Sequence, residues 1–360
     1  MAASYYRERE NRLTLATRDL MRELPPVVNQ FMLSIKQTTQ PLTRYAYACD
    51  LKLFFGYLMR EVPRFAGRSP ALWTDEDFAS VTSTDVYAYL DYLSYYIRDD
   101  DTEVSNQDQA KQRKLSSLRR FYNYLYKTER IESNVMMLVD MPKKHEKPIL
   151  RMEIDEVMRM LDLASSTETF EGHQRAYNEK LHVRDTAILM LFLGTGIRVS
   201  ELVGLDIQDI DFSMNAFSVT RKGGSQAILY FSEEVADAIR AYLDERNSIE
   251  AVQGHENALF LSTQRKRMGV RAVENMVKKY ATMSAPLKKR LSPHKLRSTF
   301  GTNLYHETGD IYLVAESLGH KDVNTTRRHY AAMSDDRKRL VPQYIKLRDT
   351  DPPPENPDSE

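Results

Sequence analysis

The stretch LGHKDVNTTRRHYA, residues 318–331, holds a histidine and, ten positions later, a tyrosine at the end of a polar run. A tyrosine hydroxyl, whose ordinary pKa is about 10, is a poor nucleophile at neutral pH. It can attack where cations and hydrogen-bond donors stabilise the phenolate and the charge developing on its target. Gly319 is expected to end a helix, so that His320 projects from a helix terminus. Tyr330 is thus a candidate nucleophile, provided that other basic side chains reach it.

A second candidate group lies in SPHKLRSTF, residues 292–300. Ser292 is a suitable N-cap and Pro293 suits the first helical position. His294 and Arg297 would then be neighbours on one face near the start of a helix. Because that end of a helix favours anions, the pair could form a phosphate site. A surface pair that merely caps or solvates the helix is the alternative interpretation.

Two further basic residues lie at positions suited to phosphate chemistry. Arg198 follows a Gly-Thr-Gly break and begins a short helix with Glu201, which could orient it. A guanidinium holds phosphate through two parallel hydrogen bonds. Lys222 is expected at the tip of a hairpin, RKGGSQ, where it could protonate a leaving alkoxide. Taken alone, these residues could equally be a surface ion pair and an ordinary hairpin-tip lysine.

Helical periodicity dominates the first part of the chain. Residues 43–62 repeat apolar and aromatic side chains at helical spacing. Residues 111–131 are amphipathic, with Leu115, Tyr122 and Leu125 on one side. We expect the tyrosines of this region to pack in the core and its rim, not to form a platform for stacked bases.

The stretch DMPKKHEKPIL, residues 140–150, contains two prolines and three lysines and indicates an exposed linker. Beyond it, a helix, a polar stretch, a buried helix, a hairpin and several further helices are expected. The predicted fold is therefore mainly α with a small antiparallel sheet. The expected divisions are an N-terminal extension (1–24), a helical domain (25–139), the linker (140–150), a second domain (151–348) and a disordered acidic tail (349–360).

Composition narrows the class of protein. The single cysteine, Cys49, excludes an intramolecular disulfide framework and indicates a reducing compartment. The N-terminus lacks the apolar segment of a secretory signal. The longest apolar run, AILMLFL at 187–193, is far shorter than the roughly 18 residues of a membrane span. A soluble, cytoplasmic protein without a membrane partner is expected.

The formal net charge is zero, but the charges are unevenly distributed. Residues 262–297 contain eleven Lys/Arg and one acid, and residues 105–147 contain ten bases and five acids. Such base-rich stretches in a neutral chain suggest a polyanionic partner. Ordinary solvated helix faces would explain them as well.

The order of the motifs is more specific than any one of them. An arginine, a hairpin lysine, H-x-x-R, L-G-H and a late tyrosine follow one another along the chain. This set resembles the tyrosine recombinase (phage-integrase) family, through TGIRVSELVGL (195–205), RKGGSQ (221–226), SPHKLRSTFGTNL (292–304) and LGHKDVNTTRRHYA (318–331). The resemblance covers residues 25–345. Within the family, the sequence looks most similar to the Xer group, especially the XerS-like branch of single recombinases that resolve chromosome dimers.

The resemblance implies a two-domain architecture, with a helical core-binding domain and an α/β catalytic domain clamped round double-stranded DNA. It implies a specific recombination site and a homotetramer on two duplexes, with a C-terminal helix, here residues 335–349, docking on a neighbouring protomer. A DNA translocase is a further candidate partner. Because the energy of the phosphodiester is retained in a covalent link, the resemblance implies no cofactor, no ATP and no metal.

By motif, the catalytic set would be Arg198, Lys222, His294, Arg297, His320 and Tyr330. The arginines would clamp the scissile phosphate, and Tyr330 would attack the phosphorus to leave a 3′-phosphotyrosyl link and a free 5′-hydroxyl. Lys222 would protonate the departing 5′-oxygen. The two histidines would hydrogen-bond the phosphate or help to move the proton of the nucleophile.

This chain departs from the family pattern in one respect. The commoner spacing has one residue fewer between the L-G-H histidine and the tyrosine. Because one helical residue turns a side chain by about 100°, the intervening turn must absorb the difference. Tyr330 remains the candidate nucleophile because the next tyrosine, Tyr344, follows Pro342 and is too remote. Candidate DNA contacts are Lys111, Lys114, Arg119 and Arg120 in the first domain and Arg265, Lys266 and Arg267 in the second.

Three alternatives remain to be weighed. A catalytically silent DNA-binding relative is disfavoured because the catalytic set is complete. An integrase or excisionase of a mobile element uses the same chemistry and stays open. A zinc enzyme using His294, His320 and His329 is disfavoured by the single cysteine and by the lack of an H-x-x-x-H helix.

Overall fold

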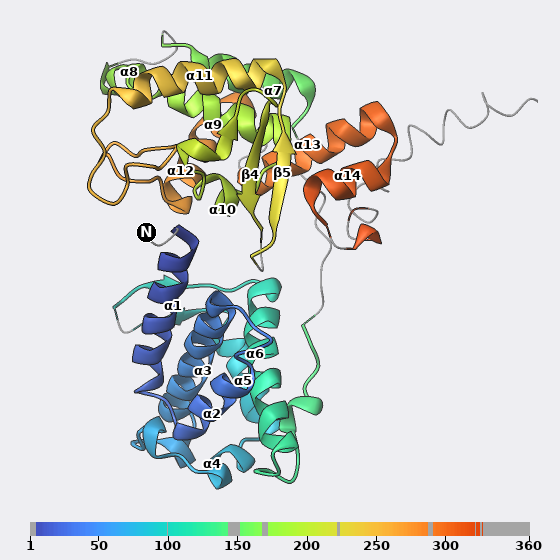
Figure 1. The fold of residues 1–360 in the computed structure, drawn as a ribbon. Helices are drawn as coiled ribbons and strands as arrows, with labels where there is room; N and C mark the ends of the chain where they lie inside the picture. The colour runs from blue at the N-terminus through green and yellow to red at the C-terminus, as the bar shows by residue number, and fades with distance from the viewer. Residues whose placement is uncertain are drawn as a thin grey trace, which may run out of the picture. The chain divides into compact units, whose positions relative to one another are not determined.

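The computed structural model describes residues 5–98, 100–142, 152–167, 172–221, 224–286, 291–320, 322–324 and 326. The chain divides into two compact units, residues 1–147 and residues 148–360, called here the N-terminal unit and the C-terminal unit. The division falls within the proline- and lysine-rich stretch 140–150. Both units are mainly helical and their sheets are small and antiparallel, so the predicted fold class is confirmed (Figure 1).

The N-terminal unit is built of helices joined by short turns. Its α-helices are α1 (Tyr5–Met21), α2 (Pro26–Ser34), α3 (Pro41–Glu61), α4 (Asp75–Ala79), α5 (Ser83–Tyr92) and α6 (Asp108–Lys127), and a short ribbon pairs β1 (Tyr96–Ile97) with β2 (Glu103–Val104). Proline begins α2 and α3, where its missing N–H is not needed. Capping boxes, in which a threonine and an aspartate exchange hydrogen bonds, begin α4 and α5.

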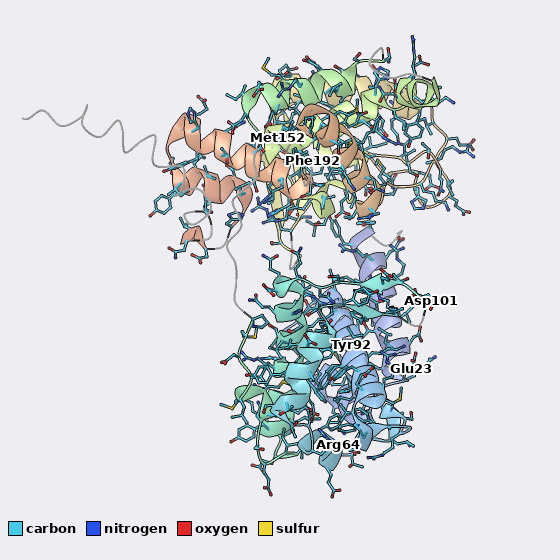
Figure 2. The ribbon with its side chains drawn as sticks, turned by 180° about the vertical axis from the view of Figure 1, so that it is seen from behind. Glu23, Arg64, Tyr92, Asp101, Met152 and Phe192 are labelled. Atoms are coloured by element: carbon cyan, nitrogen blue, oxygen red, sulfur yellow. The ribbon has the colours of Figure 1, made fainter. Side chains whose placement is uncertain are left out.

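Aromatic rings fill the core of this unit. Phe121 of α6 packs edge-on against Phe31, Phe55 and Phe78, with ring centroids 5.4–6.0 Å apart. The predicted apolar face of α6 is confirmed, because Leu115, Tyr122 and Leu125 are fully buried. The ring centroid of Tyr92, labelled in Figure 2, lies 5.0 Å from that of Tyr57 and 5.1 Å from that of Tyr96. Of the tyrosines in residues 111–131, Tyr122 is buried in the core and Tyr124 packs against it, as predicted, whereas Tyr126 is exposed.

The C-terminal unit combines helices with one three-stranded sheet. Its elements are α7 (Ile154–Ser165), α8 (Gly172–Glu179), α9 (His182–Thr195), α10 (Val199–Leu202), β3 (Ile210–Asp211), β4 (Ala216–Thr220), β5 (Gln226–Tyr230), α11 (Glu233–Asn247), α12 (Val270–Ser284), α13 (Pro293–Thr308) and α14 (Ile311–Leu318). The strand order is β3-β4-β5, and all neighbours are antiparallel. The predicted hairpin is present as β4 and β5, with Thr220 opposite Gln226.

Helix α9 is the centre of the C-terminal unit and packs against α7, α11 and α13. Its apolar run AILMLFL is almost wholly buried, and Phe192 is fully enclosed (Figure 2). The helix ends at Gly196, whose φ of +62° is left-handed. A Cβ at Gly196 would stand 3.0 Å from Cε1 of Phe300 and 3.1 Å from Cδ2 of Leu318. The ends of α9 and α14 thus meet against α13 at a position where only glycine fits.

Among the described helices, none has both the length and the apolar character needed to cross a membrane.

Candidate active site

The first candidate side chain, Arg198, is fixed at the start of α10. It occupies the N-cap position, as the sequence predicts. Glu201 is buried, and its carboxylate accepts hydrogen bonds from the Arg198 backbone N–H (3.0 Å) and from Nη1 (2.8 Å). One carboxylate therefore holds both the backbone and the side chain of the arginine. The Arg198 side chain keeps about a third of its surface exposed, so the guanidinium borders solvent.

The second arginine, Arg297, comes from the first turns of α13. Ser292 is the N-cap and Pro293 begins the helix, as predicted. The Arg297 side chain is almost fully buried, and its guanidinium donates to the carbonyls of Gly196 and Leu318. It therefore joins the end of α9 to the end of α14.

The two arginines meet at the C-terminal end of α14. Arg198 Nη2 donates to the carbonyl of Leu318 at 3.1 Å and to that of Gly319 at 3.3 Å, and Arg297 donates to the same Leu318 oxygen. The last carbonyls of a helix have no partner within it and carry partial negative charge. They are therefore suitable acceptors for two cations. The structure thus gathers guanidinium groups from α10 and α13, far apart in sequence, around one two-residue turn.

His320 follows directly on that turn. Gly319 ends α14 in the left-handed region, at φ +57°, and the backbone N–H of His320 returns to the carbonyl of Ala315 at 2.9 Å. The histidine therefore projects from a helix terminus, as predicted. Its Nδ1 lies 2.8 Å from Oγ1 of Thr326, which is fully buried. Where the threonine hydroxyl donates, the neutral ring carries its proton on Nε2. Thr326 was not a predicted site residue.

His294 lies in a different environment from Arg297. It is exposed on the first turn of α13, whereas Arg297, three residues later, is buried. His294 could therefore contact a phosphate only if that phosphate is bound at the surface of the unit. Lys222 and Tyr330 lie outside the described residues.

The basic candidates of the N-terminal unit differ in how they are held. Lys111 donates to a serine hydroxyl at 2.6 Å, and Arg119 donates to the carbonyl of Val139. Lys114 is half-buried, and burial lowers the pKa of its ammonium group. Arg120 is exposed on α6. Of these four, Arg120 is the one most available to a partner.

The candidates of the C-terminal unit differ in the same way. Arg267 donates to two backbone carbonyls at 2.8 and 3.2 Å and also pairs with Asp206, so it ties a loop to the end of α10. Arg265 and Lys266 are exposed at the adjoining turn. Unlike Arg267, whose side chain is held by backbone carbonyls and Asp206, these two present exposed side chains.

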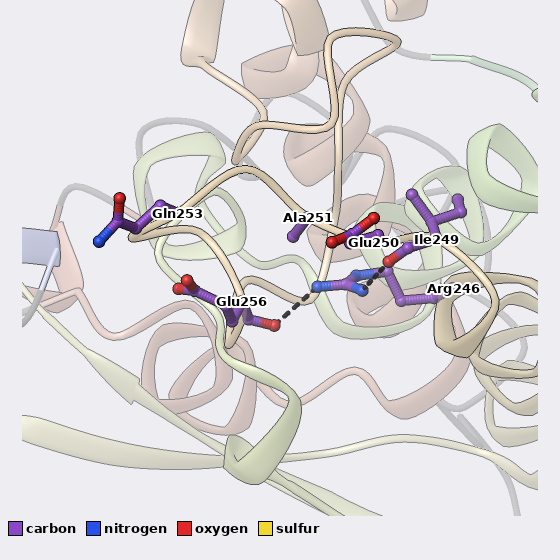
Figure 3. A pocket seen from close by; sticks show the side chains of 6 residues that line it. All are labelled: Arg246, Ile249, Glu250, Ala251, Gln253 and Glu256. Atoms are coloured by element: carbon purple, nitrogen blue, oxygen red, sulfur yellow. Dashed lines mark hydrogen bonds between the residues drawn. The ribbon is translucent and has the colours of Figure 1, made fainter.

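Two other features of the C-terminal unit serve structure. A pocket lined by Arg246, Ile249, Glu250, Ala251, Gln253 and Glu256 lies beside a loop (Figure 3). The Arg246 guanidinium donates to three backbone carbonyls along that loop, at 2.7–3.3 Å.

Elsewhere in the C-terminal unit, buried Asn178 accepts from Lys279 (3.1 Å) and from Tyr280 (3.0 Å). Burial lowers the pKa of Lys279 and raises the pKa of Tyr280.

Within the described ranges, no group of three or more His, Cys, Asp or Glu side chains is arranged to hold a metal ion. Of the three histidines of the zinc hypothesis, His294 and His320 are described and His329 is not.

Comparison with known proteins identifies the family. Residues 142–337 match the phage integrase family. The tyrosine recombinase XerC of Caldanaerobacter subterraneus subsp. tengcongensis is 34% identical over 313 residues, covering 84% of this chain and 82% of that protein. The tyrosine recombinase XerS of Streptococcus thermophilus is 32% identical over 333 residues, covering 83% and 89%.

Solved structures show the same fold. The XerH site-specific recombinase bound to a palindromic difH substrate aligns with a TM-score of 0.63 and 17% identity, covering 88% of this chain and 85% of that one. The Tn1549 transposon integrase in complex with circular intermediate DNA also aligns with a TM-score of 0.63, at 18% identity, covering 89% and 100%.

These matches define the class of protein: a tyrosine recombinase, an enzyme that breaks and rejoins DNA strands. The chain belongs to the phage integrase family. Within that family it is a site-specific recombinase of the Xer type, with XerC and XerS relatives at similar identity.

Proposed function

We propose that the C-terminal unit cleaves and rejoins one specific DNA site through a 3′-phosphotyrosyl intermediate. One observation carries the assignment of residues: the guanidinium groups of Arg198 and Arg297 meet at the Leu318 carbonyl, and His320 follows on the same turn. Arginines suit this task because their fork of N–H donors matches phosphate oxygens and stays charged at any physiological pH.

In the proposed step, the Tyr330 oxygen bonds to the scissile phosphorus as the bond from phosphorus to the 5′-oxygen breaks. Lys222 gives a proton to the departing oxygen, which leaves as a 5′-hydroxyl. The phenol proton passes to a histidine, His294 or His320, or to water. Arg198 and Arg297 stabilise the extra negative charge on the pentacoordinate phosphorus. Attack by a 5′-hydroxyl of the partner duplex reverses these bond changes and joins the exchanged strands.

The carbonyls that hold the two arginines prepare this step. A guanidinium has five N–H donors, so it can keep a backbone acceptor while it binds phosphate oxygens. Arg297 is buried and linked to two helix ends, and Arg198 is linked to Glu201 and α14. Donors that are already oriented lose little entropy when the substrate binds, which favours catalysis.

The two units would share the work of holding DNA. We propose residues 25–139 as the core-binding domain and residues 151–348 as the catalytic domain, with exposed Arg120, Arg265 and Lys266 contacting phosphates. We further propose a homotetramer on two duplexes, in the cytoplasm, with residues 335–349 docking on a neighbouring protomer. Such docking would make cleavage depend on assembly and guard against stray nicks.

The proposed biological role is resolution of chromosome dimers. The XerC and XerS relatives cover most of this chain and support that role over other uses of the same chemistry. A DNA translocase would then be a natural partner. Integration of a mobile element is the second candidate, because the Tn1549 transposon integrase has the same fold.

The test of the chemistry uses a suicide substrate, a nicked duplex from which the cleaved end diffuses away. We expect the unchanged protein to form a covalent adduct that resists detergent and EDTA, and Tyr330→Phe to form none while still binding DNA. Tyr312→Phe is the matched control, since Tyr312 is 70% exposed on α14 and has no proposed role. Adducts that persist in Tyr330→Phe would show that another residue attacks.

The two biological roles predict different cleavage sites. Mapping covalent adducts on genomic DNA should give one site near the replication terminus if the protein resolves chromosome dimers. Cleavage at the boundary of a mobile element would instead support integration.

A further inference from the structure

We infer that Arg221, at the end of β4, supplies a third guanidinium to the scissile-phosphate site. This inference rests on the proposed function and deepens it. Arg221 precedes the hairpin turn, and its backbone N–H donates to the carbonyl of Ser225 at 2.7 Å, while its own carbonyl accepts from Gly224 at 3.0 Å. The backbone of Arg221 is therefore held by the hairpin, so its side chain starts from a fixed point.

The side chain of Arg221 reaches the turn at which the other two arginines meet. A Cβ added to Gly319 would overlap the Arg221 guanidinium, with Nη2 2.9 Å away. Gly319 is the residue whose carbonyl accepts from Arg198 at 3.3 Å, and it follows Leu318, whose carbonyl accepts from Arg297. Three guanidinium groups, from the residue after β4, the N-cap of α10 and α13, thus surround one two-residue turn. Gly319 is needed there both for its left-handed φ and for the room it leaves to Arg221.

One atom of Arg221 points to a missing acceptor. Its Nε is buried and has no hydrogen-bond partner in the described part of the chain. A buried N–H without an acceptor is costly, and most buried polar atoms in proteins do have a partner. The neighbouring charges identify the kind of acceptor, because three guanidinium groups at one turn repel one another until an anion binds between them. A phosphodiester oxygen supplies both the acceptor and the negative charge.

The proposed role is charge neutralisation and hydrogen bonding at a non-bridging phosphate oxygen. The need for it is greatest in the pentacoordinate state, where the phosphorus oxygens carry one more negative charge than in the diester. Arg221 would therefore affect the rate of cleavage more than the affinity for DNA. A residue that only packed the hairpin against Gly319 would not depend on the charge of the substrate.

The experiment exploits that dependence on charge. Arg221→Met keeps an unbranched stem but removes the cation. It is compared with the unchanged protein on two suicide substrates, one with a scissile phosphodiester and one with a methylphosphonate, in which a methyl group replaces a charged oxygen. We expect covalent adducts on the diester to form about a hundredfold more slowly in the variant. On the neutral methylphosphonate, the two proteins should differ by only a few-fold, and band-shift affinity for the diester should be similar.

Two further variants guard the interpretation. Arg221→Gln, neutral but polar, repeats the comparison, so that a packing defect particular to methionine cannot imitate the result. Arg240→Met is the matched control, because Arg240 lies on α11 in ion pairs with Glu233 and Asp237 and should change neither rate. The inference is overturned if Arg221→Met and Arg221→Gln cleave the diester at the unchanged rate, or if their defect is equally large on both substrates. Absence of any Tyr330-dependent adduct in the unchanged protein would instead overturn the proposed function, and this inference with it.

Discussion

Adding one methyl group at Gly196 tests how the site is built. The φ of +62° lies in the left-handed region, where an alanine costs about 1–2 kcal/mol. The new Cβ would overlap Cδ1 of Phe300 and stand 3.0 Å from its Cε1 and 3.1 Å from Cδ2 of Leu318. Such overpacking adds about 1–3 kcal/mol. We therefore expect Gly196→Ala to lower the free energy of unfolding of the C-terminal unit by about 2–5 kcal/mol.

Gly196→Ala should also slow cleavage, because the Gly196 carbonyl accepts a hydrogen bond from Arg297 and Leu318 lies against the new methyl group. Displacing either acceptor moves the arginine that joins them. A misplacement of about 1 Å at a catalytic group can slow a reaction by about a hundredfold. Covalent adduct formation at saturating DNA should therefore fall by about that factor in molecules that remain folded.

Stability would be measured by urea unfolding, and the rate on a suicide substrate under conditions where both proteins are folded. Gly254→Ala is the matched control, because Gly254 has a φ of +85° but no atom within 4 Å of its added Cβ. It should show the conformational cost without the overpacking, and an unchanged rate. Equal stability losses in the two variants, with unchanged cleavage in both, would refute the packing of α9, α13 and α14 described above.

Two smaller predictions concern single carboxylates. Glu201→Gln keeps one side-chain oxygen but loses the negative charge that pairs with Arg198. Because Arg198 is partly exposed, we expect urea unfolding to show a stability loss of about 1 kcal/mol, together with slower adduct formation. An unchanged cleavage rate would show that Arg198 does not need the Glu201 carboxylate to hold it. Burial alone would raise the pKa of Asp77, but hydrogen bonds from Arg68 and Thr74 outweigh it and hold the pKa below its usual value. The stability this gives is complete above pH about 4 and is lost as pH falls through the lowered pKa, so unfolding of the N-terminal unit should become easier at acid pH, and less so in Asp77→Asn.

Local features of the fold were predictable because each depends on few residues. A left-handed glycine fixed the end of α9 and another the end of α14, and Ser292 with proline fixed the start of α13. The hairpin followed from two strand-like runs around a glycine pair. In contrast, α8 lies in a polar stretch whose helical pattern is weak, and no turn or cap signal marked it.

The basic residues show where sequence reasoning stops. Arg119, Arg267 and exposed Arg265 all lie in base-rich stretches and look alike there, yet the first two donate to backbone carbonyls. Whether an arginine faces solvent or ties down a loop depends on the tertiary position of the acceptor, which no local pattern contains. For the same reason Thr326 and Arg221 were missed. Both lie within motifs quoted above, RKGGSQ and LGHKDVNTTRRHYA, but the sequence gives neither of them a role. Arg221 lies against Gly319 and Thr326 contacts His320, and those contacts come from the tertiary structure.

That turn explains why the site could be assembled from distant pieces. The end of a helix offers several carbonyls without partners, and each can accept from an arginine brought by another element. At Leu318 and Gly319 these acceptors hold Arg198 and Arg297 in place, while the glycine leaves room for Arg221. Cations packed this closely are stable only while acceptors or an anion face them, so the proposed site would already be shaped for a phosphate before DNA binds. On this reasoning, the affinity of the proposed site for phosphate would follow from the backbone geometry of α14 as much as from the arginines themselves.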